Sequence, residues 1–511
     1  MTESTEPVTP AGITAPAEAA DPAESADAVG RDAAAPGAER TYAADELFFS
    51  TTDARGRIRR ANAIFMRLSG YPRGALVGRA HSAVRHETMP AGLFRSIWED
   101  LEQGRAASAY ITNRSADGGF YRVFATIVPS GDGYLSVRTL PMLARRRDEI
   151  EAAYGRVRAV ERASAAAGST RREAAAAGHS ALLAELDALG FRDAVAFTRQ
   201  ALPAEVAALV SAGVDIPERP DAEGPVAVIL DQMNRIESLT SGQVALLDEC
   251  ARIVALLGRR ATEIDDLSAR LGRLRTSLRD AVGGAARAGA DDGTARSGGA
   301  GRAGGAEEVR ERYERVDALV LECVEELRPL AGQVGELRSD TDSLRFAIAL
   351  LRLLNLAAGF FALQILEGED ELEANDAVGS LKELAAALDE GARSLSERVE
   401  LFEARSELVI GGLDDVAAAL AATHAPLLDL LEAVEARTAD AAGGTAGTAS
   451  ATNAGEADAV RAARALVGNG FPEARDLADT AGAVRDLGVP DVSADLGAHL
   501  QRVRAALAEL A

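Results

Sequence analysis

The stretch FYRVFATIVPSGDGYLSVR, residues 120–138, carries the clearest structural signal in this sequence. Its two ends, Phe120–Val128 and Gly133–Arg138, are rich in β-branched and aromatic residues, which favour strands. Between them, Ser130–Gly133 reads SGDG, a sequence typical of the turn in a β-hairpin. Residues 120–138 therefore predict two consecutive antiparallel strands.

Similar signals continue upstream of this hairpin. A turn sequence, ADGG, separates it from another strand-like stretch. Asn is a favoured helix cap and Pro a favoured first helical residue, so each marks the start of a short helix. In chain order we expect strand 47–52, strand 57–60, a helix opened by Asn62, a helix opened by Pro90, and strands 107–113, 120–128 and 133–138.

This order of elements is that of PAS domains, and short motifs resemble them as well. STTD at residues 50–53, LSGY at 68–71 and LVGR at 76–79 are similar to PAS domains in general. More specific motifs resemble the PAS domains of bacterial aerotaxis receptors: VRHETMP at 84–90, LFRSIWEDLEQGR at 93–105, TNR at 112–114 and YLSVRTLP at 134–141. The resemblance implies an α+β PAS fold, an antiparallel five-stranded sheet with short helices.

In the aerotaxis-receptor family the pocket of this domain holds FAD, so the resemblance implies a flavin cofactor. Flavin binding needs apolar walls for the ring, amides for its polar edge and cations for its phosphates. Two departures bear on this expectation: Thr88 replaces the family's Asp, and the Trp that usually precedes the third strand is absent. The residues that match the family's motifs, and that we expect to bind the cofactor, are Asn62, Arg85, His86, Trp98 and Asn113.

Each of these residues also has a purely structural interpretation. Asn62 can serve as a helix cap, Trp98 can belong to the core, and His86 beside Arg85 can be a surface pair. We expect Arg138, at the end of a strand, to form an ion pair at the surface.

The remainder of the chain predicts long amphipathic helices. Apolar residues recur with alternating spacings of four and three in two stretches, 246–278 and 309–355, which is typical of coiled coils and bundles. The two helices can form an antiparallel hairpin or pair with a second subunit. We expect these parts: 1–40, a disordered acidic Ala/Pro-rich tail; 41–142, the PAS sensor domain; 143–282, a linker helix and helical region; 283–305, a flexible Gly/Ala linker; 306–437, a helical bundle or coiled coil; 438–456, a flexible linker; 457–511, short C-terminal helices.

Composition narrows the possible functions. The formal net charge of −24 argues against nucleic-acid binding, and the N-terminus lacks the features of a signal peptide. Residues 346–366 are apolar but interrupted by polar side chains, so we expect a buried helix rather than a membrane span. Cys250 and Cys323 lie on apolar stripes, which indicates buried thiols in a reducing compartment. No catalytic motif or metal-ligand spacing is present.

The sequence thus predicts a cytoplasmic, non-enzymatic sensor of redox or energy state, which signals through helical contacts and forms a homo-oligomer. Residues 353–385 faintly resemble the kinase-contacting tip of chemotaxis receptors, which implies the chemotaxis coupling protein and kinase as partners. The alternative is a cofactor-free PAS module that dimerises a helical scaffold.

Overall fold

The structure is a computed structural model that describes residues 37–288, 299–368, 374–443, 461, 464–465, 467–468, 471–486 and 492–510. Most of the expected tail 1–40 and linker 438–456, and part of the linker 283–305, lie outside these residues. The chain forms two compact units. The first contains residues up to Asn234 together with Leu353–Asp389 and Leu500–Ala511, and the second contains Arg235–Arg352 and Glu390–His499.

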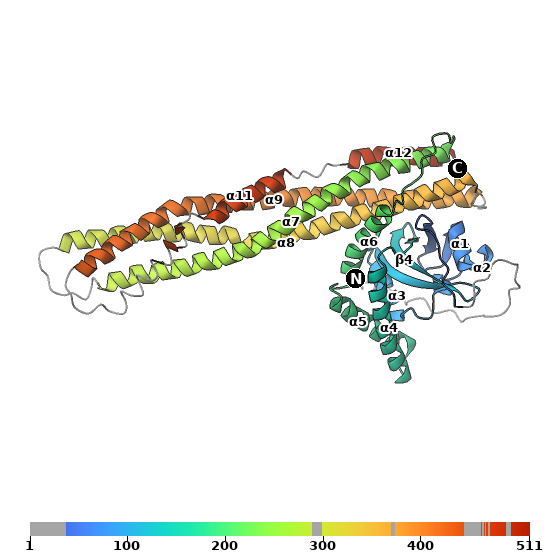
Figure 1. Cartoon of the computed structure of the whole chain (residues 1–511), viewed down its shortest axis with the longest axis horizontal. Helices are drawn as coiled ribbons and strands as arrows, with labels where there is room; N and C mark the ends of the chain where they lie inside the picture. The colour runs from blue at the N-terminus through green and yellow to red at the C-terminus, as the bar shows by residue number, and fades with distance from the viewer. Residues whose placement is uncertain are drawn as a thin grey trace, which may run out of the picture. The chain divides into compact units, whose positions relative to one another are not determined.

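The first unit is built on one five-stranded antiparallel sheet, visible beside β4 in Figure 1. The strand order is β2-β1-β5-β4-β3, so the first and last strands of the domain meet in the middle of the sheet. This confirms the expected PAS-type sheet. The strands are β1 (Phe48–Asp53), β2 (Ile58–Ala61), β3 (Ala107–Arg114), β4 (Phe120–Ser130) and β5 (Gly133–Thr139).

Short helices connect the second and third strands. They are α1 (Ala63–Ser69), α2 (Arg73–Leu76), the 3₁₀ helix η1 (His81–Val84) and α3 (Ala91–Glu102). Asn62 is the N-cap of α1, and its side chain accepts a hydrogen bond from the Phe65 backbone N–H at 3.3 Å. Gly70 ends α1 with a φ of 68°, a left-handed conformation that glycine adopts without steric cost.

Three further helices follow the sheet within this unit: α4 (Ala144–Ala166), α5 (Arg171–Ala188) and α6 (Ala194–Ser211). Gly92 of α3 and Gly178 of α5 touch so closely that a Cβ on Gly92 would come within 2.3 Å of the Gly178 backbone. Pro203 lies inside α6, and the helix continues through it. The buried side chains of Leu202 and Val206 hold this part of α6 in place by packing.

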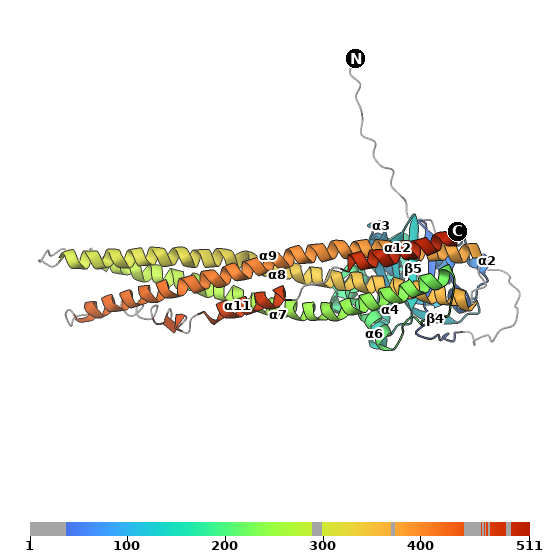
Figure 2. The same ribbon diagram turned by 90° about the horizontal axis from the view of Figure 1, so that it is seen from above.

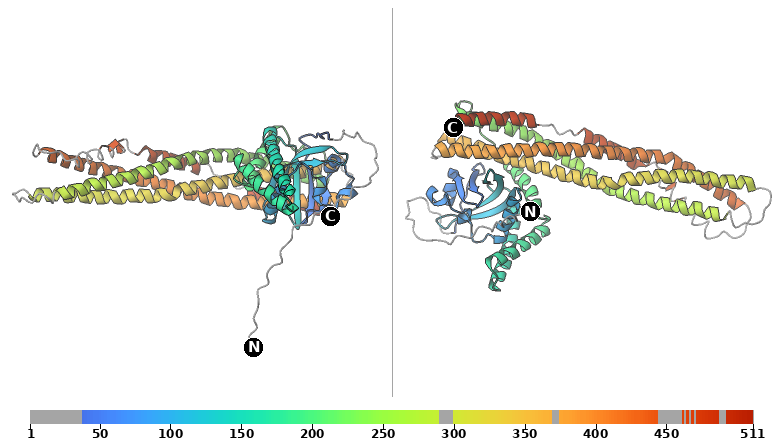
Figure 3. Two further views of the ribbon diagram at one scale, coloured as in Figure 1. Left: turned by 90° about the horizontal axis from the view of Figure 1, so that it is seen from below. Right: turned by 180° about the vertical axis from the view of Figure 1, so that it is seen from behind.

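The second unit is a bundle of long helices. Its elements come from α7 (Pro225–Ala288), α8 (Gly299–Glu367), α9 (Ala374–Gly443) and α11 (Pro472–Arg485), and the chain ends with α12 (Ser493–Glu509). Figures 2 and 3 show α7, α8 and α9 side by side. The ion pair of Arg275 with Asp317 joins α7 to α8, and the contact of Cys323 with Thr423 joins α8 to α9.

The two heptad stripes are buried within one chain, and the ion pairs of Arg275 with Asp317 and of Arg352 with Glu237 place α7 and α8 antiparallel. Leu257, Leu271 and Leu278 of α7 are at most 1% exposed, and Val320 and Leu337 of α8 are equally buried. Of the two pairings left open by the sequence, the structure therefore contains the antiparallel one within the chain. Both thiols are buried and free. Burial raises the pKa of Cys250 to about 11, as expected for an unreactive core thiol.

Two helices contain stretches that are long and apolar enough to cross a membrane, one within Glu307–Glu367 and one within Asp376–Ala436. The stretch in the first is 89% buried inside the protein. The core helix of a soluble protein has this property too, so length and composition are weak evidence for a span.

Candidate functional site

The inner face of the sheet is the face that α1 and η1 cover. Side chains alternate between the two faces along a strand, and the register pairs Phe48 of β1 with Arg138 of β5. Both side chains therefore point to the same face. The ring of Phe48 stacks on Phe65 of α1 with centroids 5.9 Å apart, and Phe65 stacks in turn on His81 of η1 at 5.8 Å. Aromatic rings thus fill the space between the sheet and these helices.

Arg138 lies among these rings and is only 3% exposed. Its Nη2 donates to Ser50 Oγ at 3.1 Å and lies 2.5 Å from His81 Nε2, and its Nη1 donates to the Ser136 carbonyl at 3.4 Å. The guanidinium carbon is 5.1 Å from the Phe65 ring centre. Burial lowers the pKa of Arg138 to about 10, so the side chain remains charged near neutral pH.

No carboxylate is paired with this charge among the residues that the structure describes. Burying an ion costs several kcal/mol unless an opposite charge compensates it. Cation–π contacts and neutral acceptors recover part of this cost. The expected surface ion pair of Arg138 is therefore wrong, because the register of β5 on β1 turns its side chain inward.

His81 accepts the hydrogen bond from Arg138 in its neutral form. Burial, and secondarily the charge of Arg138, hold the pKa of His81 well below its ordinary value. Tyr121 of β4 approaches the same place, with its ring 6.2 Å from that of Phe48. Its hydroxyl is buried and has no hydrogen-bond partner among the described residues. Burial raises the pKa of Tyr121 far above neutrality, so this hydroxyl keeps its proton.

The five residues expected to bind a flavin do not form one cluster around this charge. Asn62 is 1% exposed and serves the fold: besides capping α1, its Nδ2 donates to the Leu47 carbonyl at 3.3 Å and its Oδ1 accepts from the Phe49 N–H at 3.4 Å. Trp98 packs edge-to-face on Tyr134 with centroids 5.3 Å apart. It also lies against the turn at Gly56, where a Cβ would come within 2.9 Å of the indole.

The other three residues gather at the end of β3. The backbones of Arg85 and Asn113 form an isolated antiparallel β-bridge, and the Arg85 guanidinium lies 4.0 Å from the ring centre of Phe94. The Nδ2 of Asn113 is buried without a hydrogen-bond partner among the described residues. His86 contacts Thr88, with 2.8 Å between Nδ1 and Oγ1.

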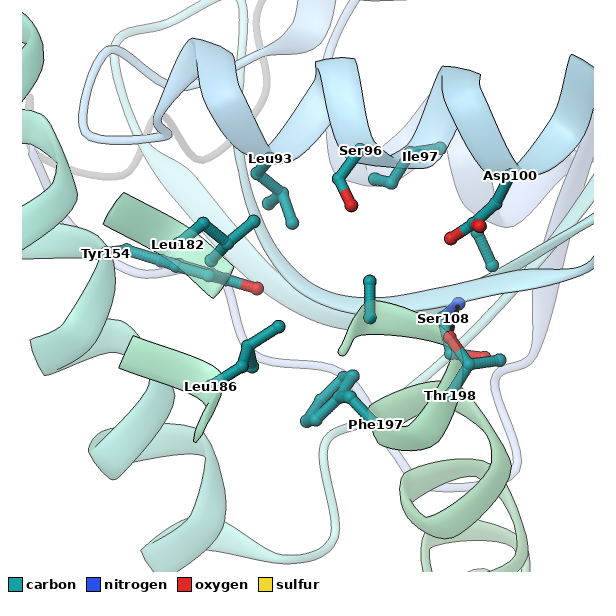
Figure 4. Close-up of a pocket in the computed structure, with 12 residues that line it drawn as sticks. Leu93, Ser96, Ile97, Asp100, Ser108, Tyr154, Leu182, Leu186, Phe197 and Thr198 are labelled. Carbon is teal, nitrogen blue, oxygen red and sulfur yellow. Dashed lines mark hydrogen bonds between the residues drawn. The ribbon is translucent and has the colours of Figure 1, made fainter. Parts of the chain in front are cut away.

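This interior does not fit a flavin. Ring-sized ligands occupy cavities of roughly 300 Å³ or more. One cavity among the described residues has a volume of about 20 Å³, enough for one water molecule, and it lies elsewhere. Figure 4 shows it between Leu93 and Ile97 of α3 on one side and Leu186 and Phe197 on the other. On the inner face, the stacked rings and Arg138 occupy the place that a cofactor ring would need.

The outer face of the sheet is also covered. Phe49, the residue after Phe48, points to this face and packs edge-to-face on Phe361 of α8, with centroids 4.9 Å apart. Both rings are 1% exposed. Beside them, Arg60 of β2 pairs with Glu383 of α9. The Arg60 guanidinium lies close to Gly379, where a Cβ would come within 2.8 Å of it.

A buried carboxylate joins the outer face to the end of the sheet. Glu205 of α6 accepts from the Tyr110 hydroxyl at 2.6 Å, from the Met142 N–H at 2.7 Å and from the Leu143 N–H at 3.2 Å. Met142 and Leu143 connect β5 to α4, so Glu205 holds the point where the chain leaves the sheet. Burial raises the pKa of Glu205, and these donors oppose that rise.

The segment expected to resemble a signalling tip belongs to the first unit. The apolar residues of this segment between Leu353 and Leu363 are at most 7% exposed. This stretch therefore offers no open apolar face to a partner in this structure.

The sequence alone missed His81, Tyr121 and Glu205 as residues of interest. Period-two alternation from Phe48 places Arg138 inward once the pairing of β1 with β5 is known, but that pairing joins residues far apart in sequence. No local signal marks His81 or Glu205.

Comparison with known proteins agrees with this geometry. Residues 45–138 match the family model of the PAS fold. The aerotaxis receptor of Escherichia coli (strain K12) is 38% identical to this chain over 100 residues, which are 19% of this chain and 20% of the receptor. The match thus spans about a fifth of that relative's length. Residues 45–138 therefore form a PAS domain similar to that of an aerotaxis receptor, and a mostly helical region follows it.

Proposed function

We propose that this chain is a cytoplasmic, non-enzymatic signalling protein whose PAS domain acts on the helical region of the same chain through the outer face of its sheet. The contact between Phe49 and Phe361 carries this proposal. It joins the middle of the sheet to α8, and the pairing of Arg60 with Glu383 extends it to α9.

The two faces of β1 are coupled by adjacent residues. Phe48 stacks on Phe65 inside the domain, and Phe49 packs on Phe361 outside it. A ligand can shift a conformational equilibrium only through contacts that differ between the two states. A change in the packing around Phe48 alters the position of the next residue, and so the contact with α8. Signal transmission then needs no element other than β1.

A flavin is the sensory group that similarity to an aerotaxis receptor favours, and it would report redox state. The filled inner face opposes flavin binding, and the relay through β1 involves no flavin. A visible spectrum of the purified full-length protein tests this point directly. Flavin absorbance bands in stoichiometric amount would contradict the packing of Phe48, Phe65 and Arg138.

For partners, we propose the chemotaxis coupling protein and kinase, in line with the same similarity. The apolar stretch 353–363 is buried, so a partner would gain access to it only after α8 leaves the sheet. Co-purification of both proteins with the full-length chain, stronger for Phe49→Ala than for wild type, is the expected result. Homo-oligomers would form through surfaces other than the heptad stripes, which are already buried within one chain.

Hydrogen–deuterium exchange tests the relay itself. In Phe49→Ala, amides of residues 353–366 should exchange faster, since a buried Phe→Ala substitution costs about 3–5 kcal/mol. The control is Leu408→Ala, at a side chain that is 56% exposed. Unchanged exchange of 353–366 in Phe49→Ala would rule out the proposed coupling.

The second candidate is a cofactor-free PAS module that dimerises a helical scaffold. The filled inner face favours its first half. Dimerisation is less well supported than the absence of a cofactor, because Phe361 and α6 already cover the outer sheet face that a dimer would use. A stable dimer in sedimentation, lost on truncation of residues 41–142, would support this alternative.

A further inference from the structure

Arg138 has the properties of an anion receptor. It is buried, it carries a positive charge, and all the hydrogen-bond partners found for it are neutral: Ser50 Oγ, the Ser136 carbonyl and His81 Nε2. A guanidinium recognises planar oxyanions through paired N–H donors. A buried guanidinium of this kind gains most from an anion that comes from outside the chain.

Two hydroxyl groups lie on the same face of the sheet and lack partners among the described residues. These are the side-chain oxygens of Tyr121 and Ser136, and both are buried. Ser136 is two residues from Arg138 on β5, which places it on the same face. Tyr121 and Arg138 both lie near Phe48. The ring centre of Tyr121 is 6.2 Å from that of Phe48, and the guanidinium carbon of Arg138 is 5.7 Å from the same ring centre. Buried hydroxyls are normally hydrogen-bonded, so these two are available as donors to a ligand.

His81 fills the position in front of Arg138. Its ring lies nearly parallel to Phe65, with an interplanar angle of 10°, and its Nε2 faces the guanidinium. It therefore resembles a flat ligand that stacks on a phenyl ring and presents an acceptor edge. It reaches this position from η1, a single short turn of 3₁₀ helix.

We propose that the inner face of the PAS domain binds a small monocarboxylate, with Arg138 as its charge partner, the hydroxyls of Tyr121 and Ser136 as donors, and His81 as an internal occupant that the ligand displaces. One guanidinium matches one negative charge. The rings of Phe48 and Phe65 suit a short apolar or aromatic body. The proposal names the ligand class for the proposed sensor, and only its signalling consequence rests on the relay.

Calorimetric titration of the full-length protein with formate, acetate and benzoate tests the site, with sodium chloride at the same ionic strength as the reference. Wild type should bind at least one of the three. His81→Ala should bind that anion about tenfold more tightly or better, because the competing imidazole is gone. Arg138→Gln should lose binding, and the exposed control Arg145→Gln should keep it.

Absence of binding in both wild type and His81→Ala overturns the proposal, as does equal binding by a folded Arg138→Gln. If Arg138→Gln does not fold, the comparison of His81→Ala with wild type decides alone, and equal or weaker binding by His81→Ala overturns the displacement. Hydrogen exchange separates this site from the relay. Carboxylate binding without any change at residues 353–366 contradicts the relay and leaves the site intact.

Discussion

Replacement of Glu205 by Gln should loosen the junction between the sheet and α4. The carboxylate accepts three hydrogen bonds, and its side chain is buried. In the variant, the amide NH₂ must face one of the backbone N–H donors, since both carboxylate oxygens are used as acceptors. Hydrogen bonds to a charged group contribute about 1.5–3 kcal/mol each, and an unsatisfied buried donor costs about 1–3 kcal/mol. The expected loss of unfolding free energy is therefore about 2–4 kcal/mol.

The single tryptophan makes this loss measurable in the correct part of the chain. Trp98 lies in α3 and packs on Tyr134 of β5, so its fluorescence reports unfolding of the PAS domain. In urea, with a slope of about 2 kcal/mol per M, the midpoint of the Trp98 transition should fall by about 1–2 M.

The matched control is Glu185→Gln. Glu185 pairs with Arg156, whose side chain is 56% exposed, and surface pairs of this kind contribute at most about 1 kcal/mol. Equal midpoints for Glu205→Gln and wild type would refute the assignment of Glu205 as the residue that holds the junction. So would a shift of the same size in Glu185→Gln.

Three further variants test other parts of the structure. The pKa of His81 is lowered in the folded protein. Below about pH 6.5 the unfolded chain therefore binds a proton that the folded one does not, and the free energy of unfolding falls as the pH drops. His81→Gln should remove up to about 1.4 kcal/mol per pH unit of this dependence, measured by urea titrations at pH 7 and pH 5.5. Asn62→Ala should lower the Trp98 midpoint by an amount equivalent to about 1–2 kcal/mol, and retained stability would contradict its role as a cap. Arg352→Ala removes a guanidinium that is only 5% exposed, together with its ion pair to Glu237, and should destabilise the helical bundle by about 3 kcal/mol. Far-ultraviolet circular dichroism measures this loss, and an unchanged melting curve would mean that the ion pair is dispensable.

The sequence by itself determined the kinds of element and their order. Turn residues, the Asn62 cap and the alternation in residues 120–138 depend on neighbours within a few positions, so they are readable locally. The same holds for the heptad stripes, since a helix repeats every 3.6 residues whatever packs against it. The motifs that resemble aerotaxis receptors identified the PAS domain for the same reason: they are short and contiguous.

Only the tertiary structure decided which residues each face of the sheet contacts. Alternation along β1 separates Phe48 from Phe49, but nothing near them in sequence indicates that one stacks on Phe65 and the other packs on Phe361. The residues proposed for a flavin were chosen by motif, and packing gave Asn62 and Trp98 structural neighbours instead. Arg138 shows the physical reason most clearly. Whether a strand-end arginine is solvated or buried depends on which strand pairs beside it and which helix covers it, and both are long-range contacts.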